Sequence, residues 1–503
     1  MQNQTAWNIV KSMKLGSRTA ENEQNTLGEY FVETESWRKV YEGEVDLILA
    51  PKGGGKTAIY SMLKRRQTEL FDRKILLIDA GDPTEETALR EFTKENSTLT
   101  LKEKEFEKIW ELYFITLAAR TVDEHQLQND AAQQLKKELS DTGLYKPPNL
   151  PIWETIRDLY FDHLHPDRTT VKAKITKSIK VTAEKETTKR DAHEKHSLYT
   201  IPIDSLFRLG DAALRASGYQ LWILLDGLDF AFDHSVELER TALRALFATY
   251  RNHLMRLSNI SAKIFLRSDI WKSVSEGGFR GLSHFERDLT IGWNRSSLLQ
   301  LAVQRILRSE TLMSHYQADR DTILADAAKQ ERLFHQVYPE QITRGSKQLK
   351  TTFDWCLSRT KDGTGTNVPR ELIHLLTETQ SKQLKRFENG QAHLKDGAIY
   401  ESQSFKDAMP QVSVVRLEKT IYPEYPKLTN WIESLKRAKS TQTLPTLCQI
   451  WQIEESECNA IVDELVEVGF FERRQDRGEV KYVVPFLYRH ELKMIQGEAK
   501  IDA

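Results

Sequence analysis

The sequence predicts an α/β fold, in which helices cover both faces of a parallel β-sheet. Short apolar runs alternate with segments of helical periodicity, one run leads into a glycine-rich loop, and another ends in an acidic residue. Strands that alternate with helical segments are typical of a parallel sheet, because each crossover carries a helix over one face. We expect strands at Val45–Ala50, at Lys74–Asp79, at the start of Leu221–Asp229, at Ala262–Leu266 and at Asp288–Ile291.

The first strand is followed by three glycines, a lysine and a threonine, in the stretch VDLILAPKGGGKT. Gly53, Gly54 and Gly55 can adopt positive φ and bring backbone N–H groups close to a ligand, since no Cβ stands in the way. At the start of a helix, those groups and the helix dipole favour an anion. Lys56 can reach terminal phosphates, and the Thr57 hydroxyl can join a Mg²⁺ shell. The stretch therefore predicts a site for a polyphosphate and magnesium.

This stretch matches the P-loop pattern G-x-x-x-x-G-K-[ST], with Ala50 in place of the first glycine. Pro51 and Lys52 occupy the next two positions, and Ala58–Gln67 has the pattern of the helix that must follow. The alternative is a glycine-rich hairpin turn, which requires a second strand after the loop. The helical pattern favours the P-loop.

A phosphate site of this kind also needs a carboxylate at the end of a strand, and LWILLDGLD supplies two. Asp226, directly after the apolar run, can bind Mg²⁺ through water. Asp229 could polarise the attacking water, because hydrolysis of a γ-phosphate is chiefly a matter of positioning and electrostatics. Alone, LLDG would indicate a buried strand and a turn. With the upstream loop, we predict that both aspartates belong to the site.

A further strand, in AKIFLRSDIW, ends at an arginine. Arg267 is expected at the carboxyl edge of the sheet, where α/β sheets bind their ligands. There a guanidinium can bind a γ-phosphate with two hydrogen bonds. The alternative is a surface arginine that pairs with Asp269.

The motifs VDLILAPKGGGKT, ILLDGLD and IFLRSDIW together resemble the STAND branch of the AAA+-like P-loop ATPases, and DGLD is particularly similar to NACHT-type members. The longer stretch YFVETESWRKVYEGEVDLILAPKGGGKTAIY is similar to a bacterial family of stand-alone P-loop ATPases. The resemblance covers roughly residues 27–80 and 200–380. It implies ATP and Mg²⁺ as cofactors, ATP hydrolysis that switches the domain arrangement, a partner protein that carries the output, and a role in bacterial anti-phage defence.

The same resemblance extends to NVPRELI, residues 367–373, which is similar to the N-x-P-R-x-L-I signature of the helical lid in these ATPases. By that match Arg370 would occupy the sensor-2 position and reach back to the nucleotide. Pro369 would open the helix, which its fixed φ suits. The alternative is an ordinary helix start with an exposed arginine.

The span between the two motifs is longer than one strand–helix unit requires, which indicates an insertion at about residues 95–200. Leu101–Glu138 has apolar residues at helical spacing. Val171–His196 alternates Val and Ile with Lys and Thr in its first half, which suggests a two-stranded ribbon, and its second half is a solvated helix or loop. A solvated insertion is favoured over a contact with nucleic acid or an acidic partner.

The carboxyl-terminal third has helical patterns in Glu310–Leu375, and Thr377–Glu401 begins as a helix that turns at Asn389-Gly390. Further on, two short helices and a hairpin are expected, an arrangement that resembles a winged helix-turn-helix. The segments are Thr446–Trp451, Glu455–Val468, Phe470–Arg473 and Val480–Val484.

The charges of this module favour a protein-interaction or autoinhibitory role over DNA binding. A recognition helix presents basic or amide side chains to the major groove. Here that helix begins Glu454-Glu455-Ser456-Glu457, and phosphates would repel it. Only the wing, residues 473–477 (RRQDR), is basic, so wing contact with DNA is the minority interpretation.

The composition is that of a cytoplasmic protein: the 503 residues carry a net charge of −1, with 39% hydrophobic and 29% charged residues. No apolar run approaches the ~20 residues that span a bilayer, so no membrane contact is expected. The amino terminus lacks the apolar core of a signal peptide. The 3 cysteines show no CxxC spacing, so neither a zinc site nor a disulfide framework is expected.

We therefore expect a P-loop ATPase domain at 1–295, a helical lid at 296–400 and a winged-helix module at 401–503. A homo-oligomer is possible, with Arg280 or Arg287 donated in trans to a neighbour's phosphate; alternatively, both pair with Glu286 and Asp288. Two other functions stay open, an initiator-type DNA-binding loader and a nucleotide-binding scaffold without turnover.

Overall fold

The computed structural model describes residues 3–23, 26–80, 102–141, 203–228, 236–276, 285–343, 350–394, 397–476 and 478–500. The chain divides into two compact units. We call them the helical unit, which comprises Met1–Thr34, Lys52–Ala58 and Gly292–Ala503, and the sheet unit, which comprises Glu35–Pro51 and Ile59–Ile291. The loop that carries the three consecutive glycines is thus grouped with the carboxyl-terminal part of the chain.

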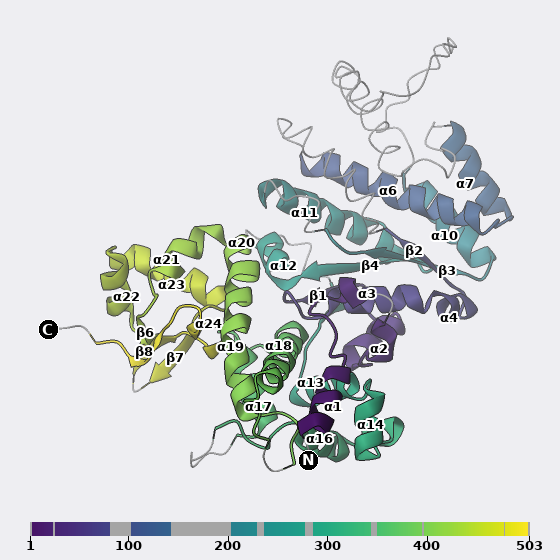
Figure 1. The fold of residues 1–503 in the computed structure, drawn as a ribbon. Helices are drawn as coiled ribbons and strands as arrows, with labels where there is room; N and C mark the ends of the chain where they lie inside the picture. Colours follow the sequence, from purple (N-terminus) through teal and green to yellow (C-terminus); the bar gives the residue numbers. More distant parts are fainter. Residues whose placement is uncertain are drawn as a thin grey trace, which may run out of the picture. The chain divides into compact units, whose positions relative to one another are not determined.

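The sheet unit is built on five parallel strands in the order β2-β3-β4-β1-β5, so the predicted parallel sheet is confirmed (Figure 1). Nearly every residue of β1, β3 and β4 is buried, which explains why these strands are continuous apolar runs without alternation. The strands are β1 (Leu47–Ala50), β2 (Ile75–Asp79), β3 (Gln220–Leu225), β4 (Ile260–Arg267) and β5 (Asp288–Thr290).

Helices cover both faces of this sheet, with α6, α10 and α11 over one face and α3 and α4 over the other (Figure 1). On the second face, the ring of Tyr60 in α3 packs edge-on against Phe265 of β4, with ring centroids 5.7 Å apart. The helices with residues in this unit are α2 (Glu35–Tyr41), α3 (Lys56–Arg65), α4 (Gln67–Asp72), α6 (Glu103–Glu124), α7 (Asp130–Asp141), α10 (Ile203–Ala216), α11 (Val236–Asn252), the 3₁₀ turn η6 (Leu254–Arg256) and α12 (Ser268–Ser275).

Helices were predicted within Leu101–Glu138, and the described residues there form α6 and most of α7. α6 is part of the core of the sheet unit. Its Trp110 indole donates a hydrogen bond to the carbonyl of Ala242 at 2.9 Å, and its Tyr113 hydroxyl donates to the carbonyl of Ala80 at 3.0 Å. Both side chains are buried. The ribbon expected within Val171–His196 lies outside the described residues.

The helical unit contains the remaining helices and a second, small sheet. Its helices are α1 (Asn3–Ser12), α13 (Arg295–Ile306), α14 (Glu310–Tyr316), α15 (Arg320–Leu324), α16 (Ala327–Val337), α17 (Thr352–Thr360), α18 (Pro369–Glu388), α19 (Ser402–Arg416), α20 (Tyr422–Glu424), α21 (Thr429–Glu433), α22 (Leu444–Trp451), α23 (Glu455–Glu467) and α24 (Phe486–Arg489). Short turns η1 (Ala20–Glu23), η2 (Leu27–Glu29) and η9 (Pro426–Leu428) are 3₁₀, and η8 (Leu417–Ile421) is a π-helical turn.

The helical pattern of Glu310–Leu375 is divided into several short helices because polar side chains cap their starts. The side chains of Ser309, Asp319, Asp326 and Thr351 each accept a hydrogen bond from a backbone N–H two or three residues further on. Such caps satisfy N–H groups that have no partner inside the helix. By contrast, α18 runs through to Glu388 and ends before the turn predicted at Asn389-Gly390.

The second sheet has four strands in the order β7-β8-β6-β9. The helices α22 and α23 and the strand β8 lie within two residues of their predicted bounds, and Gly469 with φ +76° follows the end of α23. The other hairpin strand, β7, starts two residues later than the predicted Phe470–Arg473 and extends to Asp476, where it pairs with β8. Strands β6 and β9 were not expected, because KSTQ and IQGE lack the apolar alternation that marks a strand. The strands are β6 (Lys439–Gln442), β7 (Glu472–Asp476), β8 (Glu479–Val483) and β9 (Ile495–Glu498).

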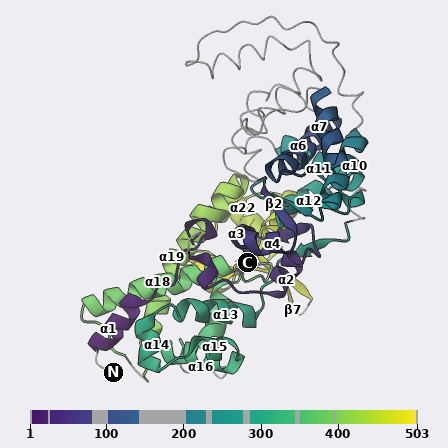
Figure 2. The ribbon, with the colours of Figure 1, turned by 90° about the vertical axis from the view of Figure 1, so that its right-hand side faces the viewer.

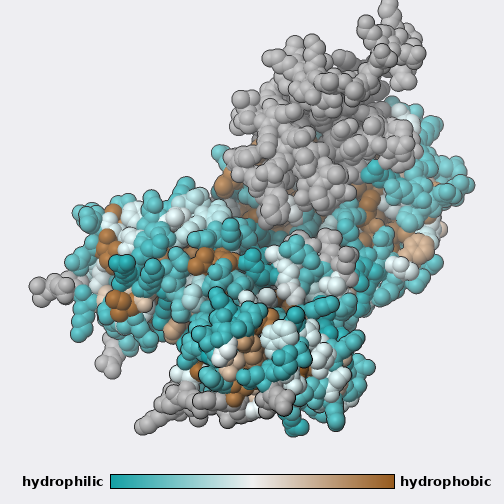
Figure 3. Space-filling model, in the orientation of Figure 1, coloured by the Kyte–Doolittle hydropathy of each residue, from teal (hydrophilic) through white to brown (hydrophobic). Residues whose placement is uncertain are grey.

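One hydrophobic core runs through the helical unit, from α1 to α24. In it Val10 of α1, Leu375 of α18, Met409 of α19 and Leu487 of α24 are all buried. Figure 2 shows α1 beside α14 and α18. On the face drawn in Figure 3, hydrophilic residues cover most of the described surface, and the hydrophobic patches are small and separate.

Candidate functional site

The glycine loop, residues 52–55, has the backbone conformation that a phosphate-binding loop requires. Gly53 has φ +84° and Gly55 has φ +102°, values that residues with a Cβ rarely adopt. Lys56 and Thr57 are the first two residues of α3, so the loop ends at the amino terminus of a helix. There the unpaired N–H groups and the helix dipole attract an anion.

Arg370 packs directly onto this loop. A Cβ added at Gly53 would lie 2.8 Å from Cβ and 3.1 Å from Nε of Arg370, so the close approach depends on glycine. Arg370 is the second residue of α18, which Pro369 opens at the first helical position. Arg370 is half-buried, which differs from the alternative of an ordinary helix start with an exposed arginine. The structure thus brings together two motifs that lie more than 300 residues apart in the sequence.

Among the described residues, two further side chains contact the glycine loop, and neither was expected from the sequence. The indole Nε1 of Trp293 donates a hydrogen bond to the carbonyl of Gly54 at 2.8 Å. The carboxylate of Glu424, in α20, forms an ion pair with the amino group of Lys52. No local pattern marks either residue; only the tertiary fold places them here.

The sheet unit presents the other candidate residues at the carboxyl edge of the parallel strands. Ala50 ends β1 and pairs with Arg267, which ends β4, while Asp226 follows directly on β3. The guanidinium of Arg267 binds the Asp269 carboxylate at 2.6 and 3.1 Å, the pairing that the sequence left open as an alternative. Asp229 lies outside the described residues.

The same edge holds one carboxylate that the sequence analysis did not select. Asp79 ends β2 and accepts hydrogen bonds from the Tyr60 hydroxyl and the Lys64 amino group of α3. These contacts fix the helix that follows the glycine loop to the end of a strand. Asp79 is therefore a structural anchor of α3, and its signal in the sequence is only its position at the end of KILLID.

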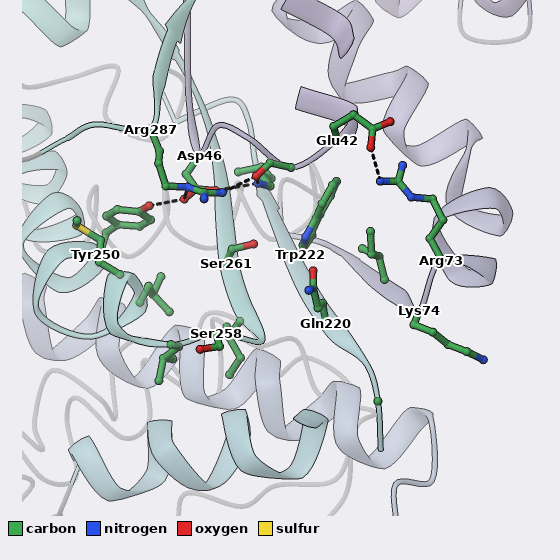
Figure 4. Close-up of a pocket in the computed structure, with 18 residues that line it drawn as sticks. Glu42, Asp46, Arg73, Lys74, Gln220, Trp222, Tyr250, Ser258, Ser261 and Arg287 are labelled. Atoms are coloured by element: carbon green, nitrogen blue, oxygen red, sulfur yellow. Dashed lines mark hydrogen bonds and ion pairs between the residues drawn. The ribbon is translucent and has the colours of Figure 1, made fainter. Parts of the chain in front are cut away.

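Arg287 occupies the opposite, amino-terminal edge of the sheet, where it contacts a buried carboxylate. Its Nε lies 2.7 Å from Oδ2 of Asp46, whose other oxygen lies 2.8 Å from the amino group of Lys263 (Figure 4). The Tyr250 hydroxyl donates to Asp46 at 2.5 Å. Arg287 therefore pairs with Asp46, and not with Glu286 and Asp288 as the alternative held. Arg280 lies outside the described residues.

The charged groups around Asp46 shift one another's pKa values. Burial by itself would raise the pKa of Asp46, but the charge of Lys263 and the hydrogen bonds from Lys263, Tyr250 and Arg287 outweigh it and hold that pKa below its ordinary value. Burial lowers the pKa of Lys263, and Asp46 opposes that shift. The cluster is a buried charge network at the base of β1.

This cluster lines a pocket of about 600 Å³ at the amino-terminal edge (Figure 4). Its cations already have partners: Lys263 donates to the carbonyl of Val45 at 2.8 Å, Arg287 to that of Gly43, and Arg73 to that of Tyr41 at 3.2 Å. The carbonyl of Tyr41, at the end of α2, attracts a cation by the same dipole that attracts anions at a helix start. Lys263, Arg287 and Arg73 thus hold the stretch of chain between the end of α2 and the start of β1.

The wing of the carboxyl-terminal module carries arginines that are paired within the chain. Arg473 forms an ion pair with Asp463 of α23, and Arg474 forms one with Glu472 at 2.7 Å. Lys481, on the facing strand, binds Asp476 at 3.0 Å and Glu498 at 2.9 Å. These acids neutralise the basic side chains that a phosphate backbone would need. Arg477 lies outside the described residues.

No helix in the described ranges is long and apolar enough to cross a membrane. Within the same ranges, no cluster of three or more His, Cys, Asp and Glu side chains has the arrangement of a metal site.

A scan against protein-family models gives no match, and neither does a comparison with curated proteins. Among solved structures, the chain is similar to a Walker-type ATPase of Pyrococcus abyssi, with a TM-score of 0.38 and 11% identity over 92% of this chain and 96% of that one. It is also similar to the ORC2 protein of Aeropyrum pernix, solved in ADPNP–ADP complexes, with a TM-score of 0.34 and 10% identity over 90% of this chain and 87% of that one. TM-scores of this size do not by themselves assign an activity.

Proposed function

We propose that the chain is an ATP-binding P-loop ATPase that works as a molecular switch. The observation that carries this proposal is the glycine loop, with left-handed Gly53 and Gly55, which leads into α3 and has Arg370 packed against it. A glycine-rich loop at the start of a helix, next to a guanidinium, fits a polyphosphate.

The roles in this proposal follow from the chemistry of each side chain. Lys56 neutralises terminal phosphates, and Arg370 reads the bound nucleotide from α18, which is part of the lid. Thr57 and Asp226 offer the hard oxygen donors that would hold Mg²⁺, and the ion would neutralise negative charge on the phosphates. Asp229 orients the attacking water, while Arg267 stabilises the developing phosphate charge once it exchanges Asp269 for substrate.

The type of switch and its biological role are proposed from the resemblance of two motifs. LLDGLD and NVPRELI support a STAND-type switch, in which residues 296–400 form the lid and residues 401–503 a winged-helix module. We propose that this switch passes its output to an effector or regulatory protein, in bacterial anti-phage defence. The paired wing arginines favour a protein partner over DNA.

Titration with a fluorescent ATP analogue tests nucleotide binding. Lys56→Ala should lower affinity at least tenfold, because a P-loop lysine contacts the phosphates directly. Lys385→Ala is the matched control: it removes an exposed lysine on the same lid helix as Arg370, roughly 22 Å further along. Equal affinity of the Lys56→Ala variant and the wild type would refute the phosphate site.

Phosphate release separates an ATPase from a scaffold that binds nucleotide without turnover. Asp229→Asn should preserve ATP binding and remove most turnover, since the amide keeps the shape but loses the charge that orients water. Asp226→Asn should instead weaken the magnesium dependence of binding. ATP binding by the wild type without any phosphate release would favour the scaffold.

A further inference from the structure

The ion pair between Lys52 and Glu424 places a carboxylate at the glycine loop, where the proposed function requires an anionic ligand. Both residues belong to the helical unit, and their side chains are 31% and 20% exposed. Lys52 immediately precedes Gly53, the glycine against which Arg370 packs. An ion pair that is largely shielded from water is stronger than one on an open surface.

Glu424 is held in place by the segment that precedes it. α19 ends at Arg416, the π-helical turn η8 follows, and α20 then carries Glu424. Arg416 is buried and binds the Glu371 carboxylate at 3.1 Å, next to Arg370 at the start of α18. Residues 416–424, which we call the coupling segment, therefore contact both the glycine loop and the start of the lid helix. π-helical turns are rare and frequently mark functional sites.

We propose that Glu424 is a specificity-determining residue of the nucleotide site, because it competes with the ligand's phosphates for Lys52. This proposal rests on the proposed function. Without nucleotide, the carboxylate neutralises Lys52. When a phosphate group binds there, Lys52 exchanges one anion for another, and Glu424 remains beside a polyanion that repels it.

The competition depends on the charge of the ligand. Repulsion between Glu424 and the ligand grows with the number of phosphate charges, so Glu424 lowers affinity most for ATP, less for ADP and least for AMP. The same carboxylate thus sets the ratio of ATP to ADP affinity, a property that no motif of the loop encodes.

Calorimetric titration of the 503-residue chain with ATP, ADP and AMP tests this proposal. Glu424→Gln should tighten ATP binding by about tenfold and ADP binding by less, while AMP binding stays the same. Glu418→Gln is the matched control: it removes one charge from an exposed position in the same segment and should change none of the affinities. Equal effects of the two substitutions, or weaker ATP binding in Glu424→Gln, would overturn the proposal.

A double-mutant cycle isolates the pair. In a Lys52→Gln background, Glu424→Gln should tighten ATP binding less than in the wild type, because no ion pair remains to be exchanged. Additive effects would show that Glu424 does not act through Lys52. If the wild type binds no ATP, the proposed function fails; if binding depends on Lys56 and Glu424→Gln behaves as Glu418→Gln, only the inference fails.

Discussion

At the residue scale, the candidate site depends on one missing side chain. Gly53 combines a left-handed φ of +84° with contact to Arg370 so close that a Cβ would lie 2.8 Å from it. Gly390, with φ +67°, has the same kind of backbone but no atom within 4 Å of an added Cβ. A substitution at Gly390 therefore measures the free-energy cost of backbone strain alone, whereas one at Gly53 measures that cost together with the cost of a steric clash.

Gly53→Ala should therefore destabilise the fold more than Gly390→Ala. Both substitutions place Cβ on a left-handed backbone, which costs about 1–2 kcal/mol, and only Gly53→Ala also displaces Arg370. Urea denaturation gives the two free energies of unfolding, and ATP titration should show lost binding for Gly53→Ala alone. Equal losses of stability would mean that Arg370 moves away at no cost.

A second prediction at the residue scale concerns the contribution of Asp46 to stability. Asp46 is 4% exposed, and its carboxylate binds Lys263, Arg287 and Tyr250. Asp46→Asn should cost about 3–5 kcal/mol of unfolding free energy at pH 7, because it leaves the Lys263 charge buried without its partner. Glu286→Gln, which removes an exposed carboxylate next to Arg287 in the sequence, is the control and should cost little.

The sign of the pH dependence follows from the lowered pKa of Asp46. A carboxyl group with a lower pKa in the folded than in the unfolded chain stabilises the fold above its unfolded pKa, about 3.9. That stability is lost as the pH falls through the folded pKa. Unfolding free energies measured from pH 7 to pH 3 should fall less steeply for Asp46→Asn than for the wild type. Parallel curves would contradict the assignment.

At the element scale, polar caps determine where helices begin, and ion pairs between residues distant in sequence determine which elements pack together. α18 begins at Pro369, contacts the glycine loop through Arg370 and is tied to α19 through Glu371 and Arg416. The backbone at Gly363 approaches the start of the wing so closely that a Cβ would lie 2.3 Å from the carbonyl oxygen of Phe471. The segment that leads into α18 and the carboxyl-terminal module are therefore packed against each other within the helical unit.

The wing supplies the prediction at this scale. Because Arg473 and Arg474 are paired with Asp463 and Glu472, the full chain should show no salt-sensitive retention of duplex DNA in a mobility-shift assay. Asp463→Asn, which frees Arg473, should be the variant that gains retention at low salt. Wild-type retention that is lost in a double Arg473→Gln, Arg474→Gln variant would instead support the initiator-type loader.

At the scale of the whole molecule, two separate hydrophobic cores correspond to the two compact units. The predicted assembly depends on an arginine that one protomer donates to the site of another, a device worth ~10³-fold in rate. Arg287, a candidate for that role, binds Asp46 within its own chain. Its removal should therefore affect folding as well as any shared site.

We predict that specific ATPase activity rises with protein concentration. Arg287→Ala should lower the melting temperature even at concentrations at which the chain is monomeric, because Asp46 loses one of its donors. Arg280→Ala, if it supplies the shared arginine, should flatten the rise without changing ATP affinity. Light scattering of the ATP-bound protein gives the oligomeric state; constant activity from a monomer would rule out a shared site.

The sequence by itself determined the parallel sheet, the glycine loop and the start of α18, because each depends on a local pattern. Apolar runs mark the buried strands, consecutive glycines permit positive φ, and proline fits the first turn of a helix. The sequence did not determine the strands β6 and β9, which are short and polar, or the division of Glu310–Leu375 into separate capped helices.

Only the tertiary structure decided which side chains contact one another. Lys52 and Glu424 are 372 residues apart, and Asp46 and Lys263 are 217 apart. No periodicity or motif relates positions so distant, because their contact depends on the register of every element packed between them. For the same reason, the sequence left two alternatives open for Arg267 and missed the partner of Arg287. The backbone conformation of the site could be predicted from local residue types. The ion pairs of the site could be identified only from the tertiary structure.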